Sequence, residues 1–311
     1  MALLLDRRGT EVKITEEVAK AAAGNESNGK EMMALLLDRR GTEVKITEEV
    51  VKAAAENEDN GKEIMALLLD RRGTEVKITE EVAKAAAGNE SNGKEMMALL
   101  LDRRGTEVKI TEEVVKAAAS NEFAGCEMVK FLHGHMGIEV TTGVIEAAAT
   151  SGQEQVLRFF SQCFSIGIED NWLKISRLYD AAKKGDAEAV RQLVDDGIPP
   201  DKQNIHGVTP LWIASSHGHK AVVQVLLATD AVRVNVRSVT GRTPLFWAAG
   251  MGYSEVVKML LDHGAEQHYI DKDGRSPASI AQFYGWMEVA DLLNKHIAQE
   301  YTIRSHSSGN E

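Results

Sequence analysis

The sequence has few cysteine, proline and aromatic residues. It contains two cysteines and five prolines in 311 residues, and Phe, Trp and Tyr together make up 5% of the chain. Two cysteines cannot form the disulfide framework of a small secreted domain, and no apolar run approaches the roughly 18 residues that indicate a membrane span. The scarcity of proline and aromatic side chains disfavours a β-sandwich or barrel and favours an array of helices rich in Ala, Leu, Glu and Lys.

Basic residues are also fewer than acidic ones. The 36 Lys and Arg residues face 47 Asp and Glu residues, which gives a net charge of −11. Because sequence-independent affinity for nucleic acid comes from basic side chains that neutralise phosphates, we do not expect a nucleic-acid partner. We expect no membrane partner either. So few cysteines are typical of a reducing compartment, which predicts a cytoplasmic protein and leaves the nucleus open.

Internal repetition is what the chain has in abundance. The string MALLLDRRGTEVKITEE begins at Met1 and returns at Met33, Met65 and Met97, a period of 32 residues. Residues 1–32 and 65–96 are identical, and the other two copies differ from them at four and five positions. Units this similar can bury their apolar faces only on one another, so we expect them to stack as a one-dimensional solenoid.

Each 32-residue unit predicts two helices and a link. Thr47 stands as the N-cap before two glutamates, and the helix it begins continues through Ala53–Ala55. A second helix is predicted over Gly29–Arg40, with Gly41 as the left-handed residue that ends it. Residues 42–46 alternate polar and apolar side chains, which indicates a short extended connector.

A different five-residue motif recurs in the C-terminal part. It is GVTPL at residues 207–211, GRTPL at 241–245 and GRSPA at 274–278, so the steps between its central Thr or Ser residues are 34 and 33 residues. A proline at the first helical position and a glycine at the turn are the local signals for a helix start. This five-residue motif resembles the TPL motif of ankyrin repeats. This resemblance implies an all-α solenoid of helix-turn-helix repeats, with short extended links or hairpins between repeats.

The resemblance also sets the expected domain organisation. Residues 1–175 are identified as degenerate ankyrin-like repeats, with four near-identical copies over 1–128 and two decayed units over 129–175. Residues 176–300 are expected to hold about four ankyrin repeats, and 301–311 a disordered tail. Where ankyrin repeats usually carry His after TPL, this chain has Trp212, Phe246 and Ser279, so the usual histidine bond between repeats is not expected.

The combination of loose and regular repeats resembles the repeat tails of fungal NACHT/ankyrin (NLR-like) proteins. That resemblance implies the recognition or assembly arm of a larger intracellular sensor. Met1 occupies the place of Met33, in the middle of a predicted second helix, so the first copy lacks its own first helix. Because terminal repeats normally need a polar cap, we expect the chain to be a fragment of a longer protein.

Motifs that carry chemistry are missing. The sequence contains no GxxxxGK[ST], GxSxG or HExxH, so we expect neither an enzyme nor a cofactor. Cys126, His133 and His135 could offer three zinc ligands, but a fourth at motif spacing is missing, and ordinary helix packing is favoured. The segment His217-Gly218-His219 matches the usual ankyrin turn between helices. We therefore expect no metal site.

Protein binding is the function that the resemblance implies. Ankyrin proteins present hairpin tips and the exposed side of each first helix, and Trp, Tyr and Arg are enriched at binding hot spots. For Trp247, packing between repeats is an equally supported interpretation. The matching candidate positions are His206, Val208, Ile213, His217, Val239, Arg242, Trp247, Met251, Lys272, Asp273, Arg275 and Tyr284.

The leading hypothesis is a non-enzymatic protein–protein interaction scaffold with an unidentified protein partner. The alternative is a repeat protein that binds a small molecule or nucleic acid. Because the four N-terminal copies are nearly identical, none of them can hold a unique site. They can offer only a repeated site, which would gain from avidity, or act as a spacer.

Overall fold

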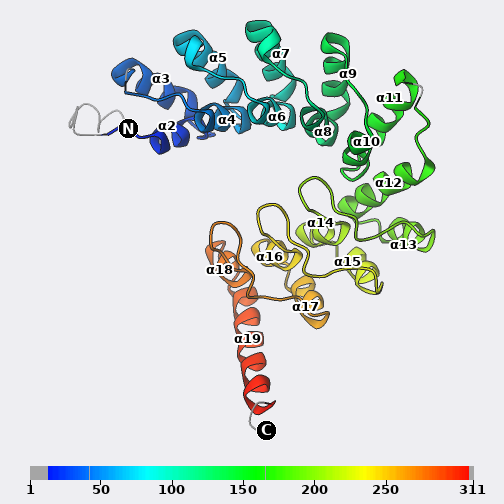
Figure 1. The fold of residues 1–311 in the computed structure, drawn as a ribbon. Coiled ribbons are helices and arrows are strands. Elements are labelled where there is room, and N and C mark those ends of the chain that lie inside the picture. Colours follow the sequence, from blue (N-terminus) through cyan, green and yellow to red (C-terminus); the bar gives the residue numbers. More distant parts are fainter. Residues whose placement is uncertain (1–12, 42, 165, 308–311) are drawn as a thin grey trace. The chain divides into compact units, whose positions relative to one another are not determined.

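The computed structural model describes residues 13–41, 43–164 and 166–307, and all regular elements within them are helices (Figure 1). The predicted all-α repeat solenoid is confirmed. By their contacts the residues divide into two compact units. The first unit comprises 1–148 and 155–167, and the second comprises 149–154 and 168–311.

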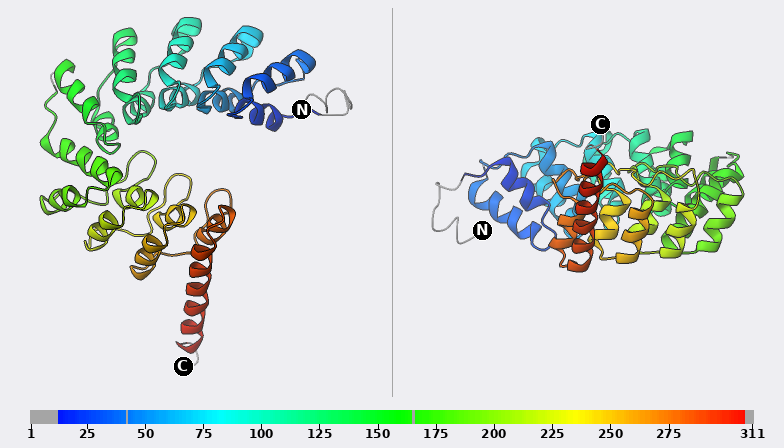
Figure 2. Two further views of the ribbon diagram at one scale, coloured as in Figure 1. Left: turned by 180° about the vertical axis from the view of Figure 1, so that it is seen from behind. Right: turned by 90° about the horizontal axis from the view of Figure 1, so that it is seen from below.

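In the first unit each copy supplies a short first helix and a longer second helix. The first helices lie side by side in one row and the second helices in another, as both Figure 1 and the reverse view in Figure 2 show. The first helices are α2 (Glu16–Ala23), α4 (Glu48–Glu56), α6 (Glu80–Gly88), α8 (Glu112–Ser120) and α10 (Thr142–Ala149). The second helices are α3 (Gly29–Arg40), α5 (Gly61–Arg72), α7 (Gly93–Arg104), α9 (Gly125–Met136) and α11 (Glu154–Phe164).

Small side chains allow the first helices of the copies to pack closely. Ala54, Ala86 and Ala118 are fully buried at equivalent positions. The start of each second helix is similarly close to the next copy, because a Cβ at Gly61 would lie 2.9 Å from the Met96 Cε atom. The alanine triplet and the helix-starting glycine are therefore packing requirements of the stack.

A ladder of buried asparagines links successive copies. Asn57, Asn89 and Asn121 are almost completely buried. The Asn89 Nδ2 atom donates to the carbonyls of Ala55 and Asn57, both at 3.0 Å. Its Oδ1 atom accepts from the backbone amides two and three residues ahead, at 3.2 and 2.7 Å. Each asparagine thus satisfies backbone groups of its own turn and of the preceding copy.

The link between copies differs from the prediction. Gly41 has a φ of −45°, so the expectation that it would be left-handed is wrong. The Glu43 amide donates to the Arg40 carbonyl at 2.9 Å, and in the next copy Gly73–Glu75 forms a 3-10 turn, η2. After α5 the chain therefore leaves the second helix through one further right-handed turn and becomes extended only afterwards, whereas Gly105 after the next second helix has a φ of +41°.

The second unit has the same two-row arrangement with different connections. Its helices are α12 (Asp170–Lys184), α13 (Ala187–Asp195), α14 (Pro210–Ser216), α15 (Lys220–Leu227), α16 (Pro244–Gly250), α17 (Ser254–Asp262), α18 (Pro277–Phe283) and α19 (Met287–Ser307). As predicted, proline begins α14, α16 and α18, and the side chains of Thr209, Thr243 and Ser276 cap them. Hairpin loops project beyond these three helices (Figure 1).

In the second unit, the loop between the two helices of a repeat carries an aromatic ring. This ring lies over a glycine in the corresponding loop of the preceding repeat. A Cβ on Gly218 (φ +71°) would lie 2.7 Å from Tyr253, and one on Gly252 (φ +76°) would lie 2.5 Å from Trp286. The same relation holds between Gly185 and His219. Both the left-handed backbone and the approach of the ring require glycine at these positions.

Both ends of the chain bear on the sequence predictions. Residues 301–307, expected in a disordered tail, belong to α19, and residues 308–311 lie outside the described residues. The helix continues because no Gly or Pro interrupts residues 287–308. Residues 1–12, on which the fragment hypothesis rests, also lie outside the described residues.

Candidate protein-binding surface

The projecting loops of the second unit are short hairpins fixed by a polar residue at the start of each turn. The amides of Asn204, Ser238 and Asp271 donate to the carbonyl four residues ahead, at 2.9 to 3.0 Å. The side-chain oxygens of the same three residues accept from the amide of that fourth residue, at 2.9, 3.3 and 2.9 Å. Asn, Ser and Asp favour such turns because their side chains bond the local backbone.

Successive hairpin tips are joined to one another. The Val239 amide donates to the His206 carbonyl at 2.9 Å, and the Lys272 amide donates to the Thr240 carbonyl at 3.0 Å. These bonds hold three predicted site residues, His206, Val239 and Lys272, in one row of tips. The row presents side chains at a fixed spacing.

A cluster of two tryptophans and an arginine lies below this row. The Trp212 indole Nε1 donates to the Arg242 carbonyl at 3.2 Å, so tryptophan supplies a bond between repeats at a position where ankyrins usually have histidine. The Trp212 and Trp247 rings meet edge to face with centroids 5.8 Å apart. The Arg242 guanidinium carbon lies 5.2 Å from the Trp247 ring centroid, within cation–π range.

A buried carboxylate fixes the arginines of this surface. The Asp271 side chain is 0% exposed and lies 3.2 Å from the Arg242 Nε atom and 3.0 Å from an Arg275 nitrogen. Burial alone would raise the pKa of the Asp271 carboxyl. Hydrogen bonds from the Arg275 amide and guanidinium and from Arg242 outweigh burial and hold that pKa below its ordinary value. Asp271 is therefore ionised at neutral pH and orients both guanidinium groups.

The structure places the twelve predicted residues unequally. Exposed positions are His206, His217, Val239, Met251, Lys272, Asp273 and Tyr284, and half-buried ones are Ile213, Arg242, Trp247 and Arg275. Val208 is only 8% exposed, and its carbonyl accepts bonds from the Asn204 amide and the Tyr179 hydroxyl. Val208 therefore offers no side chain to a partner, and it helps to anchor its hairpin.

Other exposed apolar side chains of the second unit were not predicted as site residues. They are Ile205, Ile270, Phe283, Trp286 and Met287. Two of them lie at or beside hairpin tips, and three surround the loop between α18 and α19. For Ile270, Phe283 and Met287 the sequence signal was an apolar residue at a place where the other repeats have a polar or small one.

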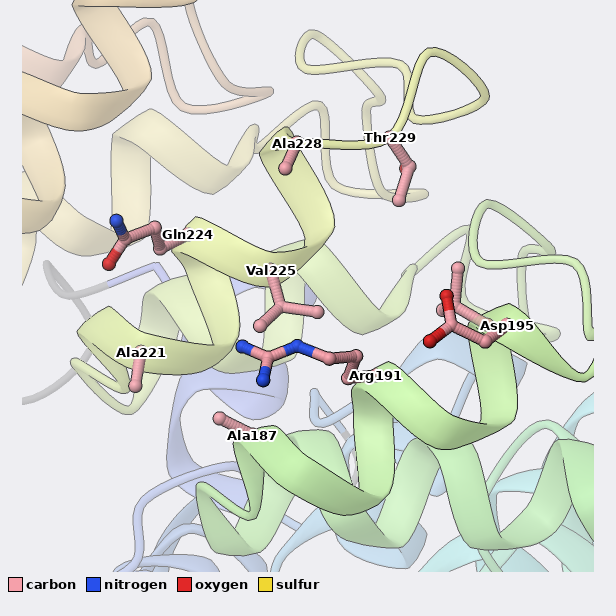
Figure 3. A pocket seen from close by; sticks show the side chains of 9 residues that line it. Ala187, Arg191, Asp195, Ala221, Gln224, Val225, Ala228 and Thr229 are labelled. Atoms are coloured by element: carbon pink, nitrogen blue, oxygen red, sulfur yellow. The ribbon is translucent and has the colours of Figure 1, made fainter.

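A groove of about 500 Å³ lies on another side of the second unit, between α13 and α15 (Figure 3). At the next junction Lys220 and Glu255 form an ion pair that links α15 to α17. The equivalent residues at the groove are Ala187 and Ala221, which cannot form such a bridge. Arg191 extends from α13 beside the groove toward α15 (Figure 3).

The residues considered for zinc lie in ordinary packing positions. The His133 ring packs against Phe159 and Phe164, with centroids 6.0 and 4.6 Å apart. Within residues 13–307, apart from those not described, no group of three or more His, Cys, Asp or Glu side chains is placed to hold a metal ion. None of the helices searched there is both long and apolar enough to cross a membrane.

Both units match known protein families. The helix-turn-helix stacking defines a helical repeat protein. Residues 3–33, 35–65, 67–97 and 99–128 each match a domain family of unknown function, DUF7104. Residues 144–238 and 178–271 match the model for ankyrin repeats (3 copies). That match begins inside the segment 129–175, where the sequence predicted decayed units.

Two proteins with curated descriptions are similar to short parts of this chain. The ankyrin repeat protein PA3287 of Pseudomonas aeruginosa is 35% identical over 51 residues, which is 16% of this chain and 30% of that protein. The E3 ubiquitin-protein ligase XB3 of Oryza sativa subsp. japonica is 41% identical over 58 residues, 19% of this chain and 13% of the ligase. The aligned regions thus span less than a third of either relative.

Proposed function

We propose that the protein is a non-enzymatic scaffold that binds a protein partner through the hairpin tips and first helices of its second unit. The observation that carries this proposal is the cluster of Arg242, Trp212 and Trp247 locked by Asp271. Its side chains are held in place before binding, so little conformational entropy remains to be lost when a partner docks. Tryptophan and arginine are also the residues that most often dominate binding energy.

The surroundings of this cluster support the same role. Met251, Tyr284 and Val239 are exposed around it, and the hairpin row supplies polar neighbours. A centre of aromatic and arginine side chains with a polar rim has the composition of a protein-binding interface. Ankyrin repeat proteins generally act as binding scaffolds, which agrees with this geometry.

A finer proposal concerns the setting. We infer that the chain serves as the recognition or assembly arm of a larger intracellular sensor of the NLR-like type, in the cytoplasm or nucleus. Its support is the resemblance of the mixed repeats to the tails of such proteins. The near-identical copies of the first unit suit a spacer that carries the binding surface.

The test is affinity capture with quantification of bound proteins. A variant with Trp247→Ala and Met251→Ala should lose the partner, whereas Lys258→Ala on the exposed side of α17 should retain it. Loss in both variants, or retention in both, would contradict the proposal. Salt-sensitive retention on RNA or heparin without a protein partner would instead support a nucleic-acid-binding repeat protein.

A further inference from the structure

The loop between α18 and α19 carries a cluster of large apolar side chains. Phe283, Tyr284, Trp286 and Met287 are exposed by 75%, 56%, 45% and 60%. The residues equivalent to Phe283 in the two preceding repeats are Ser and Gly, and those equivalent to Met287 are Lys and Ser. The cluster is therefore specific to this repeat, and exposed patches of this kind mark interaction sites.

The same face contains a loop glycine, Gly285, that no aromatic ring of a following repeat covers within the described residues. Gly285 has a φ of +81°, like the loop glycines of the preceding repeats, which are covered by His219, Tyr253 and Trp286. Apart from Gly285 itself and its two neighbours in the chain, no heavy atom of the described residues lies within 4 Å of the position that a Cβ on Gly285 would occupy. The face thus presents a projecting ring, Phe283, two residues from a glycine surface of the kind that receives rings elsewhere in this unit.

We propose that this face binds the same face of a second copy of the chain, with Phe283 of each copy over Gly285 of the other. A surface that carries both a projecting ring and the site for one is self-complementary. Two-fold pairing, the commonest symmetry of soluble homo-oligomers, satisfies both elements at once. The pairing continues the contact between ring and glycine that joins the repeats within this unit.

A further repeat in the ordinary register would not fit this face. At the position equivalent to Phe283, a Cβ on Gly250 would already lie 3.4 Å from Ile280 of the next repeat. A phenylalanine there leaves no room for a repeat stacked at that spacing. The geometry therefore favours two copies meeting face to face over continuation of the stack.

Sedimentation equilibrium of the full chain over about 1 to 100 μM tests the proposal, since this range brackets a micromolar dissociation constant. The wild-type chain should dimerise in this range. Phe283→Ser combined with Met287→Ser should weaken dimerisation by about tenfold or more, because it removes the central apolar contacts. Phe123→Ser, at a residue that is 77% exposed on the first unit, is the matched control and should leave the dimer unchanged.

Circular dichroism would verify that each variant is folded. A chain that stays monomeric throughout the concentration range, or a dimer that the Phe283 and Met287 changes leave intact, would overturn the proposal. Partner capture is tested with Trp247→Ala and Met251→Ala, which leave this face unchanged, so failure of one proposal is distinguishable from failure of the other.

Discussion

In both units successive repeats stack on one another. The contacts between repeats are the same throughout the first unit and differ from one repeat to the next in the second. In the first unit the same asparagine makes the same bonds at three successive positions, Asn57, Asn89 and Asn121. In the second unit each junction has its own ring, supplied by His219, Tyr253 or Trp286. Identical junctions build length and stability. Unlike junctions also give each repeat a different outer surface, which specific recognition requires.

The glycines under the rings should be the most sensitive positions. Gly252→Ala should lower the free energy of unfolding by about 3–5 kcal/mol, from the left-handed backbone and the clash with Trp286. All four tryptophans lie between residues 172 and 286, so denaturation followed by tryptophan fluorescence reports on the second unit alone.

Gly274→Ala is the matched control for this change. Gly274 has the same φ of +76°, but no described heavy atom outside Gly274 and its two chain neighbours lies within 4 Å of its Cβ position. Only the backbone cost of about 1–2 kcal/mol should remain. Equal effects at the two positions would show that the ring is not what fixes the junction.

Substitution of Asp271 tests how much the buried carboxylate and its two arginine partners stabilise the second unit. Asp271→Asn should cost about 2–4 kcal/mol of unfolding free energy, because two arginines lose a buried ionic partner. Since the folded-state pKa of Asp271 is lowered, its stabilising contribution is complete above the unfolded-state pKa of roughly 4 and declines as pH falls through the folded value. Urea unfolding at several pH values should show this decline in the wild type. A variant as pH-sensitive as the wild type would contradict the assignment.

The asparagine ladder tests the first unit. Asn89→Ala should cost about 1–3 kcal/mol, because buried carbonyl and amide groups lose their partner. The same change at Asn57 should cost the same within about 0.5 kcal/mol, since both bonds to the preceding copy are conserved in geometry. Unfolding followed by circular dichroism measures both variants, with exposed Lys77→Ala as the control. Clearly unequal costs would show that the junctions are not equivalent.

The smallest expected effect concerns the surface bonds between copies. Thr79→Val removes a 2.7 Å bond to Glu48 and a weak cap to the Val82 amide. Because the Thr79 bond is exposed, the cost should be about 0.5–1 kcal/mol in the same circular dichroism assay. A cost above about 2 kcal/mol would mean that surface bonds, as well as the buried asparagine, hold the copies together.

Local signals predicted the helices well. The start of the helix after Thr47 and the whole span Gly29–Arg40 were predicted from capping residues and apolar spacing, and both are confirmed. The predicted side-chain cap is wrong, because the Thr47 hydroxyl makes no cap bond and instead donates to a Glu16 carboxylate oxygen at 2.8 Å. The prediction for Gly41 failed because a glycine after a helix permits a left-handed residue without requiring one. The following Glu43 accepts bonds from the Arg40 side chain, and its amide continues the right-handed turn.

The candidate surface was predictable only in outline. The repeat register placed the hairpin tips and first helices, and it brought Arg242 and Trp247 to one surface. It did not predict that the Val208 side chain would be buried, or that Asp271 would hold two arginines. Those outcomes depend on contacts with Tyr179, Arg242 and Arg275, which lie 4 to 29 residues away in the chain.

The sequence by itself determined the helical repeats, their period and the separation into two repeat types, because periodic apolar residues, caps and turn residues act within one or two turns. Only the tertiary structure decided which side chains are covered by the next repeat and which are free. Burial of Val208, the orientation of Arg242 and the exposure of Phe283 depend on the neighbour in space. That neighbour is set by stacking, not by local sequence.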